Sequence, residues 1–181
     1  MTNKNTTPET ELLQDAGIII GWLLWKKRFD QFDWLKDGDF YGKDGMNTGI
    51  VAANWLTRLG KHCVDSINPL AATICNLSMK ACRYLSDTEL ESYMGDESIP
   101  SSVDNYYSQL MTLWPVLQPN QQTEFKELFV QREGIAHTTP LGLSIAITKE
   151  PQDSLMTKSP VPWPLNYIQF PWTSTVIEVK W

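Results

Sequence analysis

Residues that start and stop α-helices recur through the first three quarters of the chain, and they constrain the fold more than any other feature. Asn47 or Thr48 can cap one segment, and Asn68 followed by Pro69 can open a second. Ser86 with Glu89 has the pattern of a capping box. Two further helices are expected to start at Ser101 and Pro119. Helices are expected to stop at Gly60, Gly95 and Gly134, and the helix that starts at Ser101 must end before Pro115. This pattern predicts a mainly helical region.

The N-terminal segment is also predicted to be helical. Thr7 can cap it, Pro8 suits its first position, and apolar residues recur at helical spacing from Leu12 to Leu24 until the element ends near Arg28. The apolar run at 16–25 has about half the length needed to cross a bilayer, so we expect no membrane span. The Asp37-Gly38 pair between two aromatic runs predicts a short β-hairpin within 32–42.

The last third of the chain changes character. Residues 141–148 alternate partly with period two, and residues 173–180 are rich in β-branched side chains, so both segments are predicted to be strands. We therefore predict an α+β fold, mainly helical over residues 8–134 with an early β-hairpin, followed by a small C-terminal antiparallel β element at about 138–181. Residues 1–181 are expected to form one domain.

Chain length and cysteine content indicate how the fold is stabilised and in which cellular compartment it occurs. A chain of 181 residues can bury a core without disulfide or metal support. Its 3 cysteines, an odd number, fit a reducing compartment, so a cytoplasmic protein is expected. No ligand spacing for zinc or calcium and no glycine-rich phosphate loop occurs in the sequence, so no metal or cofactor is expected.

Catalytic chemistry has little support. Ser144 lies in an approximate nucleophile-elbow sequence, but both histidines precede it, so a serine on the polar side of a strand is the better interpretation. The enzymatic alternative is a small hydrolase or nuclease that uses His137 with loop carboxylates between Asp33 and Asp44.

A second alternative is a nucleic-acid-associated subunit of a larger complex. Its candidate contact residues are five cations: Lys26, Lys27, Arg28, Arg58 and Lys61. They fall at or just past predicted helix ends, where cations are favoured for local reasons. Direct nucleic-acid contact is therefore the weaker alternative.

The leading hypothesis comes from the acidic and aromatic residues. The net charge is −6, and between Tyr84 and Phe125 there are acids but no Lys or Arg. We predict an acidic, tyrosine-bearing surface made by Glu89, Glu91, Tyr93, Asp96, Glu97, Asp104, Tyr106 and Tyr107. The 8 tryptophans exceed ordinary usage, and we expect Trp163, Trp172 and Trp181 to be interface anchors.

These features predict a non-enzymatic protein-interaction protein. It would be an accessory subunit, an inhibitor or an immunity-type binder that occupies a surface of a larger protein partner. A basic or nucleic-acid-binding partner would suit the predicted acidic surface.

Overall fold

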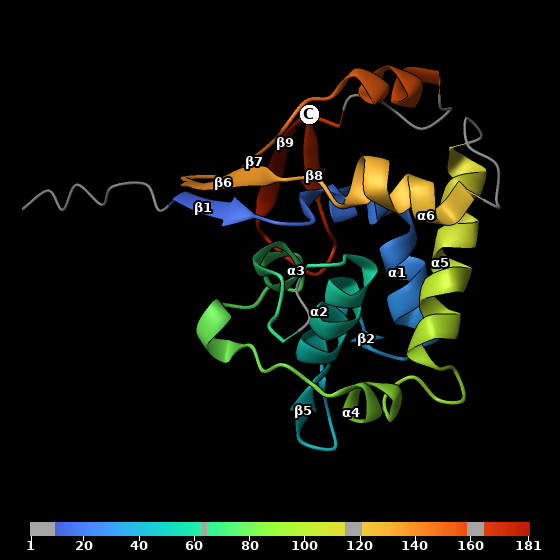
Figure 1. The fold of residues 1–181 in the computed structure, drawn as a ribbon. Coiled ribbons are helices and arrows are strands. Elements are labelled where there is room, and N and C mark those ends of the chain that lie inside the picture. Colours follow the sequence, from blue (N-terminus) through green and yellow to red (C-terminus); the bar gives the residue numbers. More distant parts are fainter. Residues whose placement is uncertain (1–9, 63–64, 115–120, 159–164) are drawn as a thin grey trace, which may run out of the picture.

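A five-stranded sheet combines a strand at residues 10–13 with four strands between residues 134 and 180 in the computed structural model, which describes residues 10–62, 65–114, 121–158 and 165–181 (Figure 1). Its order is β1-β6-β7-β9-β8, and all neighbouring strands are antiparallel except the parallel pair β7 and β9. The strands are β1 (Thr10–Leu13), β6 (Gly134–Thr139), β7 (Gly142–Ile147), β8 (Tyr167–Gln169) and β9 (Val176–Lys180).

The α-helices gather below this sheet and to its right in Figure 1, whereas the helical segment Pro151–Lys158 is drawn above it. The α-helices are α1 (Trp22–Gln31), α2 (Thr48–Leu59), α3 (Pro69–Ile74), α4 (Asp87–Glu91), α5 (Ile99–Leu113) and α6 (Gln122–Phe125). Other helical turns are η1 (Ala16–Gly21), η2 (Met79–Ala81), η4 (Lys126–Val130) and η5 (Pro151–Lys158). The predicted α+β class is therefore confirmed. None of the helices in the described ranges is long and apolar enough to cross a bilayer.

Several predicted helix starts are confirmed by their hydrogen bonds. The Asn47 side chain accepts from the Gly49 amide at 2.8 Å, and the Asn68 side chain accepts from the Leu70 amide at 2.9 Å. Ser86 and Glu89 form both bonds of the capping box. The next helix, α5, is capped by Ser98, so it begins slightly before the predicted start at Ser101 and ends before Pro115 as expected. The predicted start at Pro119 lies outside the described residues.

The predicted hairpin is confirmed, and a second one follows it. Asp37 and Gly38 adopt φ values of 54° and 88° between β2 (Leu35–Lys36) and β3 (Asp39–Phe40). Asp44 and Gly45 do the same between β4 (Gly42–Lys43) and β5 (Met46–Asn47), a turn that the same signal could have predicted. Neither hairpin joins the main sheet.

Three helix predictions are wrong in part. Residues Thr10–Leu13 form strand β1, which pairs with β6, and the left-handed Asp15 (φ 53°) separates it from the helical turns that follow. The helix that opens at Asn68 ends at Ile74, because Asn76 is left-handed (φ 57°), instead of continuing toward Leu85. In each case, backbone bonds or a turn override a helical apolar pattern. Gly134 does not end a helix but begins β6.

The core is rich in aromatic rings. The indoles of Trp25, Trp34 and Trp55 are fully buried. Phe29 lies among three tryptophan rings, with centroid distances of 5.9 Å to Trp34, 6.3 Å to Trp55 and 5.5 Å to Trp172. Much of the tryptophan surplus therefore serves packing.

Candidate protein-interaction surface

The predicted acidic segment is partly neutralised by arginines that lie outside it. Three ion pairs cross its boundary: Arg58 with Asp87 at 3.0 Å, Arg83 with Glu89 at 3.0 Å, and Arg28 with Glu97 at 3.6 Å, each between nitrogen and oxygen. Arg28 and Arg58 thus reach the segment through tertiary contacts, whereas Arg83 immediately precedes it in the sequence.

The other members of the predicted acidic surface have mixed roles. Glu91 accepts a hydrogen bond from the Ile99 amide at 2.8 Å and so helps to start α5, while the Asp104 carboxylate accepts one from the Gln122 side chain at 2.9 Å. Asp96 is exposed. Tyr93 is half-buried, and its carbonyl accepts from the Trp34 indole at 3.0 Å. Carboxylates are present at this corner, but several of them already hold the fold together.

The aromatic part of that surface was predicted wrongly. Tyr106 and Tyr107 are each 1% exposed, because they lie on the side of α5 that packs into the core. The Tyr106 hydroxyl accepts from the Trp25 indole at 3.2 Å, and the Tyr107 hydroxyl donates to the Leu59 carbonyl at 2.6 Å. Burial raises the pKa of both phenols, which therefore stay protonated.

The C-terminal aromatic anchors are also absent from the surface where the structure describes them. Trp172 is buried and donates to the Ile74 carbonyl at 2.8 Å. Trp181 is buried, with the Arg132 guanidinium 5.7 Å from its ring centroid. The interface prediction is therefore wrong for these two residues, and Trp163 lies outside the described residues.

The five cations proposed for nucleic-acid contact do not act alike. Arg28 and Arg58 are largely buried, and both have protein partners. On α1, the Lys26 ammonium forms an ion pair with the Asp30 carboxylate at 2.6 Å, and Lys27 is exposed. Lys61 lies just after the end of α2. The two arginines are thus structural and are not free to contact phosphates.

The proposed hydrolase site is not assembled. His137 lies in β6, where its Nδ1 is 3.1 Å from the Thr10 hydroxyl. Asp33 and Asp44 belong to the hairpin region, which Figure 1 shows at the opposite end of the molecule. Ser144 is opposite His137 on β6, but no hydrogen bond joins its hydroxyl to His137 among the described residues, so it is not arranged as a histidine-activated nucleophile.

The described residues form no site suited to thiol or metal chemistry. Burial raises the pKa of the Cys75 thiol well above its ordinary value, so the reactive thiolate is disfavoured. The described residues contain no group of three or more His, Cys, Asp or Glu side chains that could hold a metal ion.

The outer face of the sheet was not predicted from the sequence. The register places Leu12, Ile135, Ala146 and Lys180 side by side across four strands, and all four are exposed. Leu12 and Ile135 are 64% and 43% exposed, although large apolar side chains on a strand are usually buried. We call these four residues the outer sheet row. Because β1 is an edge strand of the sheet that the described residues form, no described strand pairs with its outer side, and the row begins at this edge.

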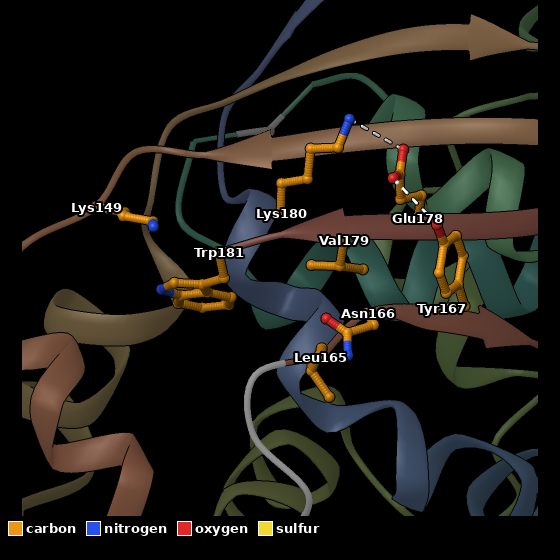
Figure 2. A pocket seen from close by; sticks show the side chains of 8 residues that line it. All are labelled: Lys149, Leu165, Asn166, Tyr167, Glu178, Val179, Lys180 and Trp181. Atoms are coloured by element: carbon orange, nitrogen blue, oxygen red, sulfur yellow. Dashed lines mark hydrogen bonds and ion pairs between the residues drawn. The ribbon is translucent and has the colours of Figure 1, made fainter.

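A polar row runs beside it on the same face. Thr10, His137, Ser144, Glu178 and Tyr167 are opposite one another across the five strands. Figure 2 shows Glu178 between Lys180 and Tyr167, with an ion pair of 3.1 Å and a hydrogen bond of 3.4 Å. These side chains border a hollow of about 290 Å³ next to Leu165 and Trp181. The outer face is thus apolar near β1 and polar near β8.

Glu178 provides a test of this polar row. The Ser144 hydroxyl and then Lys180 hold the pKa of Glu178 below 4.5, so its stabilising contribution is present at neutral pH and is lost as pH falls through the lowered value. Ser144→Ala is expected to raise the Glu178 pKa toward 4.5 and to reduce stability more at pH 7 than at pH 3. Carboxyl NMR titration and urea unfolding at both pH values measure these effects. An unchanged Glu178 pKa in the variant would contradict the assignment.

Comparison with known proteins gives one result. No curated protein and no solved structure matches the chain. A family model described as contractile injection system tape measure protein matches residues 2–181. The match therefore covers the helical region and the sheet alike. The chain belongs to the contractile injection system tape measure protein family.

Proposed function

We propose that this protein is a structural, non-catalytic component of a contractile injection system, and that it acts by binding other proteins of the assembly. The family match over nearly the whole chain supports this role. Among the kinds of binder that the sequence suggested, an accessory subunit fits a component of a larger assembly.

The exposed outer sheet row carries the proposal. Leu12 and Ile135 are directly opposite each other on β1 and β6, and Ala146 continues the row on β7. Leu12 is 64% exposed at the edge strand. An open edge presents backbone hydrogen-bonding groups, and adjacent apolar side chains gain free energy when a partner covers them. A partner strand or apolar surface can use both features at once.

The test changes the apolar character of this row. Ile135→Glu is expected to reduce association with co-expressed proteins of the injection system at least tenfold, because a carboxylate would be buried without a partner. Association is measured by co-purification and by size-exclusion chromatography. The thermal unfolding midpoint should stay close to that of the unmodified chain, since position 135 is 43% exposed.

Leu141→Glu is the matched control. Leu141 is 75% exposed but lies between β6 and β7, outside the outer sheet row. The control should associate normally. If Ile135→Glu also associates normally, or if both variants lose binding equally, the outer sheet row is not the binding surface.

A further inference from the structure

A charged groove lies on the helical side of the molecule, away from the outer sheet row. It has a volume of about 480 Å³ and lies between the end of α2, the first turns of α5 and Lys126 of η4. Pro100 and Val103 contribute apolar surface, while Arg58, Lys61 and Lys126 contribute positive charge. Asp87 and Asp104 also line it.

Lys126 is the unusual residue of this groove. Its ammonium nitrogen lies 4.3 Å from the centroid of the Tyr107 ring, and burial lowers its pKa below 10.5. Within the described part of the chain, no carboxylate forms an ion pair with it at 4.0 Å or less. The Asp104 carboxylate, which also lines the groove, opposes this pKa shift through its charge but makes no direct ion pair with Lys126. A partly desolvated ammonium without a direct ion pair is stabilised by an added anion.

The other two cations differ in how available they are. Arg58 is already used, because it donates to the Leu85 carbonyl at 2.6 Å and pairs with Asp87. Lys61 is exposed, and its backbone is held by the buried Asp15, whose carboxylate accepts from the Lys61 amide at 3.0 Å. The same carboxylate lies 2.6 Å from Nδ1 of His62. Asp15 thus fixes the turn that carries Lys61 beside the groove.

We propose that this groove binds a carboxylate on an acidic segment of a partner protein, with Lys126 and Lys61 as its ligands and Pro100 and Val103 as the apolar wall beside it. A protein carboxylate is favoured over a nucleic acid because Asp87 and Asp104 would repel a continuous row of phosphates. One or two carboxylates flanked by apolar side chains avoid this repulsion. The inference rests on the proposed function only in assuming a protein partner.

The experiment uses the full chain and a fluorescein-labelled peptide in which two Glu residues are flanked by Leu, with a matched peptide in which Gln replaces both Glu residues. Fluorescence anisotropy should show binding of the Glu peptide that weakens with salt, and weaker binding of the Gln peptide. Lys126→Met keeps an unbranched aliphatic side chain at this position but removes the charge over Tyr107. Lys126→Met should weaken binding of the Glu peptide about tenfold, whereas Lys126→Arg should retain most of that binding.

Two controls separate binding from folding. Lys126→Met should unfold at the same temperature as the unmodified chain or higher, because it removes a partly desolvated charge. Lys36→Met, at an exposed lysine of the first hairpin, should bind the peptide normally. Lys61→Met, at a residue exposed to solvent, provides a second groove variant that should weaken binding without affecting the fold.

Three outcomes would overturn the inference: normal peptide binding by both Lys126→Met and Lys61→Met, no binding of the Glu peptide by the unmodified chain, or tighter binding of a single-stranded oligonucleotide than of the peptide. Ile135→Glu should leave peptide binding unchanged. If the peptide does not bind but Ile135→Glu still abolishes co-assembly, this inference fails while the proposed function stands.

Discussion

Asp153→Ala is expected to lower the free energy of unfolding by about 3–5 kcal/mol, because it leaves a buried arginine without its counter-ion. Arg132 is 4% exposed, and its two terminal nitrogens lie 2.8 and 3.1 Å from the two carboxylate oxygens of Asp153. The same guanidinium donates to the carbonyls of Leu128 and Thr148. The pair therefore joins η4, the end of β7 and η5.

Urea unfolding of matched variants measures this effect. Asp30→Ala is the control, since the Lys26–Asp30 pair is shorter, at 2.6 Å, but both side chains are about half exposed. Its removal should cost no more than about 1 kcal/mol. The double variant Asp153→Leu with Arg132→Met should recover part of the loss, because no buried charge then remains. A cost below about 1 kcal/mol for Asp153→Ala would show that the pair is not a structural junction.

Trp55→Ala is expected to cost about 3–5 kcal/mol, the range for removing a large aromatic side chain from a core. Trp55 is fully buried on α2, and its ring centroid lies 5.3 Å from that of Tyr106 and 6.5 Å from that of Trp34. Its indole also donates to the Ser102 hydroxyl at 3.0 Å, which ties α2 to α5. The substitution removes ring contacts, leaves a cavity and removes a donor.

Thermal and urea unfolding of three variants tests this packing. Trp55→Phe should cost less than Trp55→Ala, because it keeps an aromatic ring and loses the indole donor. Tyr167→Ala is the exposed control: Tyr167 is 69% exposed in β8, and its removal should change stability by about 0.5 kcal/mol or less. Similar costs for Trp55→Ala and Tyr167→Ala would contradict the assignment of Trp55 to the core.

These two variants also separate stability from binding. Asp153→Ala and Trp55→Ala act on buried contacts, so any loss of association should follow their loss of folded protein. Ile135→Glu acts at an exposed position and should reduce association while the chain stays folded. Comparing association with the folded fraction of each variant distinguishes a binding surface from a structural one.

The sequence predicted well those features that depend on neighbouring residues. Asn47, Asn68 and Ser86 bind backbone amides within three positions of themselves, so their effect does not need the rest of the fold. The Asp37-Gly38 turn is local in the same way. Strand β7 also lies within its predicted range, because period-two alternation reflects a sheet with one buried face.

The candidate binding surface could not be found in this way. Leu12 occurs in a segment with helical spacing, and it becomes a strand residue because β6, more than a hundred positions later, supplies hydrogen-bond partners. The exposure of Ile135 likewise follows from which side of β6 the helices cover. Neither fact is a property of the local sequence.

Helix caps, the first hairpin turn and the α+β class were thus determined by the sequence itself, because each depends on backbone hydrogen bonds and side-chain spacing over a few residues. Tertiary structure alone decided that Tyr106 and Tyr107 are core residues, that arginines from outside the acidic segment neutralise part of it, and that Leu12 and Ile135 form an exposed row. Burial and ion pairing join residues far apart in the chain. Charge and hydrophobicity along the sequence show which contacts a residue can make, whereas the packed fold selects the ones that form.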